Sequence, residues 1–372
     1  MLLSAGVLAT VGSATAEPIY LSKQYTRCTT CHYSPTGGGL LTPYGRSLSK
    51  EELSTFGRSP AGTTPTDPGS GEEAFLNGLL GKALGPVQLG VDLRPSHLDF
   101  TFEGVGNSQR NILMNADLLG AYQRGAWTFY GQMGRKLEGD GGTLNSYEHW
   151  IGYQATNGLG VRVGRYLPAY GVRFADHTAF NRTLMGLTQY DQIYGAELSF
   201  TTDRTVLQLS AGPGRADSLI DAEGGSAPLF SGRFQVDLTT RTAVVFSGLF
   251  RGDSDREARS HAGGVAIGFA PTTRLTTWTG WDTRFQDHVV SDRTHVFLHQ
   301  TSFEAYRGLW LRISPQIHWS DDSPLNTIRR LVLGVDFLPR THWHVNLSYY
   351  HDRLAFTGVG TKTFLAQLHL YL

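Results

Sequence analysis

Residues 361–372, TKTFLAQLHLYL, decide the fold of this chain. Apolar side chains occupy every second position of this stretch, and mostly polar side chains occupy the positions between them. A period of two is that of a β-strand, whose successive side chains point to opposite faces of a sheet. The apolar face is Phe364, Ala366, Leu368, Leu370 and Leu372, and the other face is Thr363, Leu365, Gln367, His369 and Tyr371.

The same alternation recurs from about residue 86 onward, for instance at 87–94 (VQLGVDLR) and 330–337 (RLVLGVDF). Each segment has one apolar face and one face with charged or amide groups, which is typical of a membrane-spanning β-strand. We count about sixteen such segments. They begin near Val87, Asn111, Trp127, Ser146, Val161, Ile193, Thr205, Phe230, Thr242, His261, Leu275, Thr294, Leu309, Arg329, His342 and Thr361.

The connections between these segments alternate in length. Tight turns, such as 157–158, alternate with long polar loops, such as 172–191. Short periplasmic turns and longer external loops give an outer-membrane barrel this rhythm, with both ends of the barrel chain on the short-turn side. The strands of a soluble β-sandwich or a soluble barrel also show alternating apolar and polar residues. Sixteen strands, however, enclose an interior too wide for side chains to fill, which favours a polar lumen and a lipid-facing apolar surface. We therefore predict an all-β fold: an antiparallel transmembrane β-barrel of about 16 strands at 86–372.

The composition limits the partners of the chain. The formal net charge is zero, so no basic surface points to nucleic acid. The outer surface of the predicted barrel instead makes membrane lipid its expected surrounding.

The N-terminal residues 1–16, MLLSAGVLATVGSATA, resemble the apolar core of a signal peptide. They end in Ala14-Thr15-Ala16, a small-x-small cleavage site before Glu17. A basic n-region is missing, which leaves the true translation start open. The alternative is a buried N-terminal strand or helix. We expect the protein to be exported.

The motif Cys28-Thr29-Thr30-Cys31-His32 holds both cysteines of the chain. C-x-x-C-H is the attachment signature of a c-type haem, because the two thiols bind the porphyrin and the histidine lies beneath the iron as an axial ligand. A disulfide, a redox dithiol and half a zinc site are the alternatives. Zinc would need two further ligands at suitable spacing, and a thioredoxin-like dithiol would need a βαβ setting that the sequence does not predict. We expect one covalent haem c, bound by Cys28 and Cys31 and ligated by His32.

Four segments follow from these signals: a signal peptide at 1–16, a monohaem cytochrome c segment at 17–57, a linker at 58–85 and the barrel at 86–372. The linker is rich in Pro, Gly, Ser and Thr. The haem segment is too short to bury a core alone, so we expect the haem and a second protein surface to complete it.

Around the haem motif, the chain resembles the fused monohaem cytochrome–porins of bacterial outer membranes, a family that includes iron oxidases. The resemblance covers roughly residues 21–46 and rests on Lys23-Gln24-Tyr25, on Cys31-His32 and on Leu41-Thr42-Pro43-Tyr44-Gly45-Arg46. It implies a haem segment on the periplasmic side or inside the lumen of a 16-stranded outer-membrane barrel. It also implies an iron:cytochrome c oxidoreductase activity, with electrons passing from an extracellular donor to a periplasmic c-type cytochrome or other carrier. The glycine-rich stretch 34–39 departs from the iron oxidases, which carry a bulkier apolar turn there.

A sixth iron ligand cannot be assigned from one motif. Strand parity predicts that Met114 and Met133 face lipid, and Met185 falls in a loop expected to be external. Histidines on the polar strand face near the short-turn side are better candidates: His344, then His342 and His369, with His318 nearer the outer side. For any single one of these, an ordinary hydrogen-bonded lumen residue is the simpler interpretation. Side chains inside the haem segment stay open as well, namely Lys23, Tyr25, Tyr33 and Tyr44.

Charged residues of the barrel point to no clear ion selectivity, because the predicted lumen mixes both signs: Asp92, Asp117, Glu304, Arg94 and Arg330. The expected external loops are acidic. Such oxygen ligands could hold Fe(II) transiently, but acidic loops are also the ordinary solvated edge of an outer-membrane barrel. These loop residues are Asp176, His177, Asp217, Asp221, Glu223, Asp253, Asp255, Asp287, His288, Asp321 and Asp322.

Three functions are compatible with this sequence. The first is an outer-membrane cytochrome–porin that carries single electrons inward, with Fe(II) as the leading donor. The second is a diffusion porin whose haem segment is a structural or sensing plug. The third is a conduit that delivers electrons outward to extracellular acceptors. Direction depends on reduction potentials, which a sequence does not give.

Overall fold

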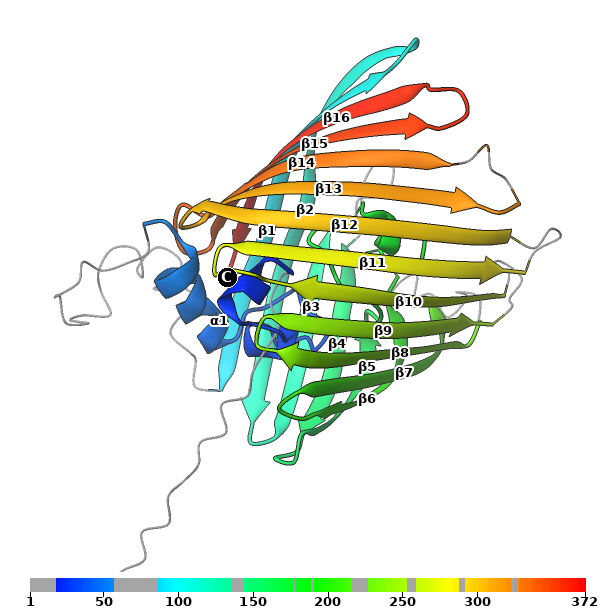
Figure 1. Cartoon of the computed structure of the whole chain (residues 1–372). Coiled ribbons are helices and arrows are strands. Elements are labelled where there is room, and N and C mark those ends of the chain that lie inside the picture. Colours follow the sequence, from blue (N-terminus) through cyan, green and yellow to red (C-terminus); the bar gives the residue numbers. More distant parts are fainter. Residues whose placement is uncertain are drawn as a thin grey trace, which may run out of the picture.

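The computed structural model describes residues 18–56, 86–135, 144–176, 178–188, 191–215, 227–252, 259–287, 292–322, 325 and 327–372. Sixteen antiparallel strands form a closed barrel in which each strand pairs with its neighbours in the sequence and β1 closes on β16 (Figure 1). This confirms the predicted all-β barrel. The predicted signal peptide and linker lie outside the described residues.

The strands of the barrel are β1 (Val87–Phe102), β2 (Gly106–Arg124), β3 (Trp127–Arg135), β4 (Leu144–Gln154), β5 (Leu159–Tyr166), β6 (Ile193–Thr201), β7 (Thr205–Arg215), β8 (Leu229–Thr239), β9 (Thr242–Arg251), β10 (Ser260–Phe269), β11 (Leu275–Gln286), β12 (Asp292–Tyr306), β13 (Leu309–Ser320), β14 (Ile328–Phe337), β15 (Trp343–Leu354) and β16 (Gly360–Tyr371). The helical turns are η1 (Pro18–Lys23), η2 (Cys28–Thr30), α1 (Pro43–Leu48), η3 (Ser49–Leu53) and α3 (Phe180–Thr183). None of the described helices is long and apolar enough to cross a membrane.

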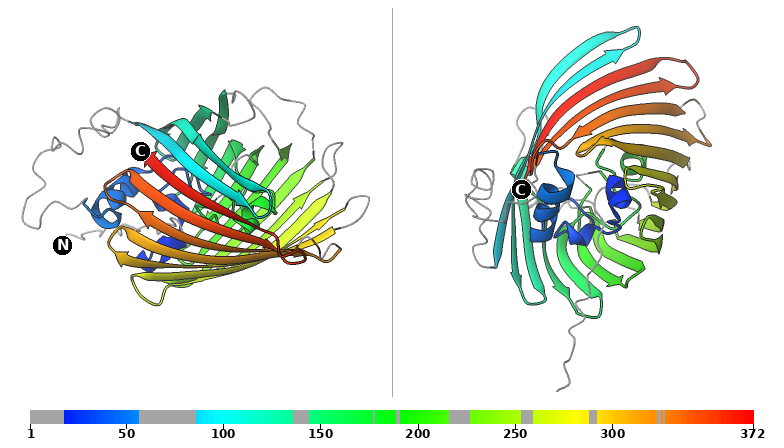
Figure 2. Two further views of the ribbon diagram at one scale, coloured as in Figure 1. Left: turned by 90° about the horizontal axis from the view of Figure 1, so that it is seen from above. Right: turned by 60° about the vertical axis from the view of Figure 1, so that its left-hand side comes forward.

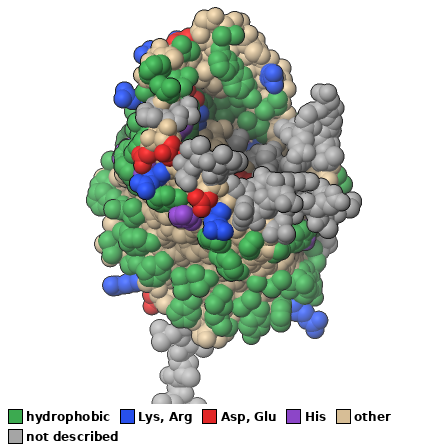
Figure 3. All heavy atoms as spheres, turned by 90° about the vertical axis from the view of Figure 1, so that its right-hand side faces the viewer, with side chains coloured by type: hydrophobic (Ala, Val, Ile, Leu, Met, Phe, Trp, Pro, Cys, Tyr) green, Lys and Arg blue, Asp and Glu red, His purple; other side chains and the backbone are tan. Residues whose placement is uncertain are grey.

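The two faces of the barrel wall have opposite character, as the alternation predicts. Phe246, Ile267 and Leu333 are exposed on the outside, whereas Glu197 and Gln235 are buried on the inside. Figure 3 looks onto the long-loop end and shows hydrophobic side chains over the flanks of the barrel. The apolar outer surface is that of a barrel surrounded by lipid rather than water.

A β-bulge overturns one parity prediction. The register between β1 and β2 shifts between Leu93 and Pro95, which lie opposite Ala116 and Leu113. A shift of one residue moves every later side chain to the other face. Met114 therefore lies inside, where it packs beside the buried Tyr350 and Leu365, and the prediction that it faces lipid is wrong. Met133 is 46% exposed on the outer face, as predicted.

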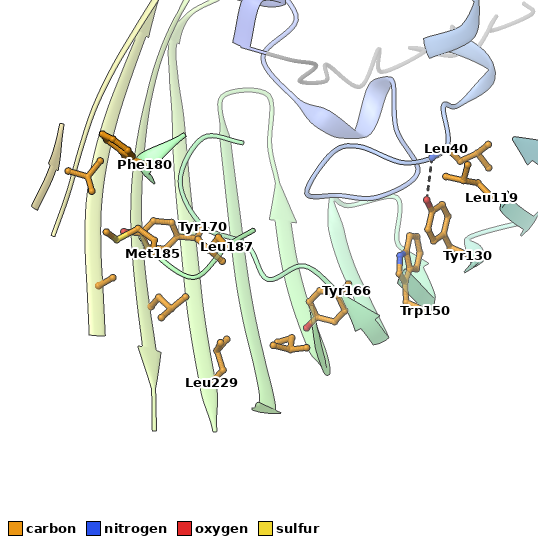
Figure 4. Close-up of a cluster of buried hydrophobic side chains, with 14 of the residues drawn as sticks. Leu40, Leu119, Tyr130, Trp150, Tyr166, Tyr170, Phe180, Met185, Leu187 and Leu229 are labelled. Carbon is orange, nitrogen blue, oxygen red and sulfur yellow. Dashed lines mark hydrogen bonds between the residues drawn. The ribbon is translucent and has the colours of Figure 1, made fainter. Parts of the chain in front are cut away.

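The long connection between β5 and β6 folds into the lumen instead of lying outside. Met185 is only 1% exposed and belongs to a buried cluster with Tyr170, Phe180 and Leu187 (Figure 4). Leaving these aromatic and aliphatic side chains in water would cost more than folding the loop against the wall. The expectation that Met185 and Asp176 belong to an external loop is therefore wrong.

The N-terminal segment, residues 18–56, also lies within the ring of strands, at the short-turn end (right view of Figure 2). Its end is tied to two tight turns, because the backbone N–H of Thr55 donates to the carbonyl of Leu338 at 2.9 Å and its hydroxyl donates to the carbonyl of Arg307 at 2.7 Å. Deeper inside, the N–H of Leu40 donates to the hydroxyl of Tyr130 (Figure 4).

The barrel wall supplies the second surface that this short segment needs. Leu21 packs in a cluster with Trp278 of β11, and Leu40 packs in another with Leu119 and Tyr130. A third cluster combines segment residues with Trp310 of β13 and the turn residue Leu338. Its segment members are Ile19, Tyr20, Cys31, Leu41, Leu48 and Leu53.

Candidate functional site

The C-x-x-C-H motif forms a tight helical turn inside the barrel. The backbone N–H groups of Cys31 and His32 both donate to the carbonyl of Cys28, at 3.1 and 2.9 Å. This hydrogen bonding brings the two cysteines one turn apart, with the histidine directly after them. Both thiols are free, so the structure holds no disulfide between them.

The residues that carry the family resemblance pack directly against this turn. The N–H of Thr42 donates to the carbonyl of Cys31 at 2.8 Å, and its hydroxyl donates to the carbonyl of Thr30 at 2.6 Å. The same hydroxyl caps α1 by accepting from the N–H of Gly45. Pro43 stands at the start of α1, where its missing N–H costs nothing. Thr42 thus joins the motif to the helix that supports it.

The glycine-rich stretch after the motif turns the chain back toward the wall. Gly37, Gly38 and Gly39 all have positive φ, between 65° and 82°, which favours glycine. Arg173 lies in the connection between β5 and β6 that folds into the lumen, which we call the inward loop. Its side chain donates to the carbonyl of Gly37. A side chain at Gly39 would collide with the hydroxyl of Tyr130, so this loop can approach the wall only because it lacks side chains.

A cavity of about 260 Å³ lies between the motif and the barrel wall. Cys28, Cys31 and His32 line one side of it. The facing side comes from β1, β14, β15 and β16 and carries Asp92, Asp336, His344, Asn346, Gln367 and His369. The structure therefore brings the motif together with two of the three distal candidates.

Burial shifts the pKa values of Cys31 and His32 in the motif. Burial, followed by the nearby Cys28, raises the pKa of the Cys31 thiol to about 12, whereas reactive redox thiols have lowered pKa values. Burial, and secondly the positive charge of Arg173, lowers the pKa of His32 to about 4. The imidazole is thereby kept neutral, the form that binds a metal. Within the described part of the chain, the buried Nδ1 of His32 has no hydrogen-bond partner. Two free thiols followed by a histidine are a donor set that would fit a covalently bound haem.

Each of the two wall histidines lies beside a carboxylate. His344 Nε2 is hydrogen-bonded to Asp336 Oδ1 at 3.0 Å, whereas His369 Nε2 lies 3.3 Å from Asp92 Oδ1 without forming a hydrogen bond. The two rings lie beside each other on paired strands, tilted by 58° and with their centroids 6.0 Å apart. A carboxylate that accepts from one ring nitrogen fixes the orientation of an imidazole.

Each of the two carboxylates also pairs with an arginine. Arg312 Nε lies 3.2 Å from the second oxygen of Asp336, and Arg94 Nη2 lies 2.8 Å from the second oxygen of Asp92. The charged side chains that line the cavity, apart from the histidines, are four arginines and four carboxylates. They are Arg94, Arg173, Arg182 and Arg312, with Asp92, Glu148, Asp176 and Asp336. The charges in this cavity therefore balance.

His342 lies apart from the other candidates. It precedes β15 in a turn with φ of 67°, so the strand alternation used to predict its direction does not extend to it. It is buried against the ring of Tyr371 and does not line the cavity. Burial, and then the charge of Arg46, lowers the pKa of His342 to about 4.

The other candidates do not line this cavity. His318 packs against Phe180 of the inward loop, with ring centroids 4.9 Å apart. Lys23 is paired with Glu304 of β12. The hydroxyls of Tyr25 and Tyr44 lie 3.3 Å apart at an exposed position.

Of the predicted acidic loop residues, the described ones are scattered. Asp321 lies at the rim beside Arg293 and His295, at 3.5 and 3.4 Å. Within the described residues, no group of three or more His, Cys, Asp or Glu side chains could hold a metal ion. His177, Asp217, Asp221, Glu223, Asp253, Asp255 and His288 lie outside the described residues.

The sequence missed the contribution of the inward loop. Arg173, Asp176 and Arg182 line the cavity although they belong to a connection expected outside the barrel. The only signal for this in the sequence is the concentration of large apolar side chains between Tyr170 and Leu187, which an external loop would not need.

The barrel is similar in fold to solved outer-membrane proteins, whereas the sequence matches none of the known families. No protein-family model matches the chain, and no curated protein matches it. Among solved structures, OprB of Pseudomonas putida has a TM-score of 0.61 at 8% identity, covering 77% of this chain and 94% of that one. The outer membrane channel DcaP of Acinetobacter baumannii has a TM-score of 0.57 at 11% identity, covering 76% of this chain and 97% of that one. An anion-selective porin from Comamonas acidovorans has a TM-score of 0.54 at 10% identity, covering 77% of this chain and 99% of that one. The chain therefore has the fold of bacterial outer-membrane porins and channels.

Proposed function

We propose that this protein is a bacterial outer-membrane cytochrome–porin that carries single electrons across the membrane. The donor is extracellular, with Fe(II) as the leading candidate, and the acceptor is a periplasmic c-type cytochrome or another carrier. The observation that carries the proposal is the position of the Cys28–His32 turn, which lies inside a porin-type barrel and faces a polar cavity. The apolar outer surface and the porin fold support the location in the outer membrane.

The residues of the chain have separate roles in this proposal. Cys28 and Cys31 would hold the haem c covalently, and His32 would ligate its iron from one side. His344 or His369, which line the same cavity, would supply a second iron ligand. A bound c-type haem supplies one-electron transfer, which is the chemistry that the proposal needs.

The thickness of the membrane explains why the lumen matters. A hydrocarbon core of about 30 Å is much thicker than one haem, so a single centre connects the two sides only from within the barrel. Residues 18–56 occupy the short-turn end of the lumen, where a periplasmic carrier could approach. An external donor would then have to approach through the lumen from the long-loop end.

The test is a stopped-flow optical measurement on the full chain, matured with covalent haem and inserted into liposomes. Fe(II) is added outside, and an electron acceptor is trapped inside. The proposal predicts a reduced c-type band followed by reduction of the acceptor. Haem that dithionite reduces but Fe(II) does not would refute Fe(II) as the donor. A protein that never acquires a haem band would refute the cytochrome assignment.

A second candidate function is a diffusion porin in which the N-terminal segment is a structural or sensing plug. The structural neighbours, which are channels and porins, favour this candidate over the electron conduit. Liposome swelling in small solutes separates the two candidates, because only a diffusion porin admits them while the segment is in place. Outward electron flow is distinguished from inward flow by measuring the reduction potential of the haem and comparing it with the potentials of the donor and the acceptor.

A further inference from the structure

A second cavity, of about 1000 Å³, has a different charge from the cavity beside His32. Turn residues at 155–158 and 201–203 line it, so its mouth is at the short-turn end. Among the described residues that line it, the charged side chains are four arginines and one carboxylate: Arg27, Arg173, Arg182, Arg233 and Asp203. The cavity is therefore positive, whereas the other cavity is balanced.

Three of these arginines have hydrogen-bond partners that are neutral oxygens. Arg173 donates to the carbonyls of Thr36 and Gly37. Arg182 donates to the carbonyls of Phe174 and Leu187, and Arg233 donates to the carbonyl of Gly171 and to two glutamine side chains. Arg27 differs, because it pairs with Asp237 at 3.4 Å.

The nearby carboxylates are already engaged elsewhere. Asp237 accepts from Arg27 and Thr26, and Glu197 accepts from Arg162 at 2.8 Å. Arg182 is buried, and burial followed by repulsion from Arg173 lowers its pKa to about 9. Asp176 and Asp191 offset part of that effect. Confined positive charges without a carboxylate partner are unfavourable, and a bound anion relieves this cost.

We infer that Arg173, Arg182 and Arg233 form a binding site for a small oxyanion of the carboxylate or phosphate class. Guanidinium groups match the planar geometry of such anions. Two sources could supply this chemistry: a diffusible anion that enters from the short-turn end, or the carboxylates of the proposed haem. The second source is geometrically open because Arg173 and Arg182 line both cavities.

The test measures the binding of inorganic phosphate to the full chain by isothermal titration calorimetry. Arg233→Gln removes one guanidinium from the cluster, and Arg233→Lys keeps the charge but not the forked geometry. Arg284→Gln is the matched control, because Arg284 also belongs to the lumen wall but lines neither cavity. The site predicts that Arg233→Gln weakens phosphate binding at least tenfold, Arg233→Lys less, and Arg284→Gln less than twofold. Heat-modifiable migration on gels verifies that each barrel is folded.

Each measurement is made on the haem-loaded chain and on the Cys28→Ala/Cys31→Ala chain. Phosphate binding to both forms supports the site and assigns it to a diffusible anion. Binding to the haem-free form alone supports the site and assigns it to the haem carboxylates. The absence of binding in both forms, or equal weakening by Arg233→Gln and Arg284→Gln, overturns the inference. The inference does not depend on electron transfer, which the reduction assay tests separately.

Discussion

Gly45 sets how closely α1 can approach the C-x-x-C-H turn. A Cβ at this position would collide with the backbone of Cys31, which cannot move aside as a flexible side chain could. Gly45→Ala gains about 1 kcal/mol of helix propensity but is expected to lose about 1–3 kcal/mol to overpacking. We therefore predict less covalent haem per barrel, measured as the ratio of haem absorbance to protein. Gly248→Ala, which has open space around the added methyl group, should leave this ratio unchanged.

The choice between His344 and His369 is a second prediction at the residue scale. The variant that removes the true sixth ligand should convert the oxidised haem from low spin to high spin, which electron paramagnetic resonance and the Soret band report. The variant at the other histidine should change the spectrum little, because that histidine would only contact the ring of the ligating one. His318→Ala is the control, since His318 is a lumen histidine away from this cavity. Unchanged spectra in both wall variants would exclude both histidines.

At the scale of elements, the N-terminal segment is anchored by ion pairs with the barrel wall. Asp237 of β8 accepts from Thr26 and from Arg27, which is itself only 4% exposed. Asp237→Asn leaves a buried guanidinium without its carboxylate, a change that typically costs about 3–5 kcal/mol. We expect limited proteolysis to cut the segment faster while the barrel keeps its heat-modifiable migration. Asp321→Asn disrupts an exposed rim pair, worth about 0–1 kcal/mol, and should not change the cleavage rate.

The elements also show how far sequence reasoning extends. All sixteen strands could be predicted, because a period of two is a local property of each segment. The direction of Met114 could not, because the bulge opposite Leu93 depends on the pairing of two strands. The inward course of the β5–β6 loop was also missed, since loop length does not reveal which way a loop folds. For the site, the motif and His344 and His369 were predicted, but Arg173, which reaches it from that loop, was not.

At the scale of the whole molecule, two inward elements narrow one barrel. Residues 18–56 fill the short-turn end, and the loop between β5 and β6 packs across the lumen, where Phe180 contacts His318 of β13. Arg173 joins these two elements through the carbonyl of Gly37. The segment and the loop therefore form one continuous obstruction, and displacement of the segment should open the barrel further than a loop change alone.

This arrangement predicts solute permeation. In liposome-swelling assays with a disaccharide, the full chain should swell slowly, because both obstructions are in place. The double variant Asp237→Asn/Glu304→Gln removes the carboxylates that hold Arg27 and Lys23, so it should release the segment and increase the swelling rate severalfold. Asp321→Asn/Asp322→Asn removes two rim carboxylates and serves as the matched control. Rapid swelling of the unmodified chain would instead favour the diffusion porin, because electron transfer gives no reason for an open path of that width.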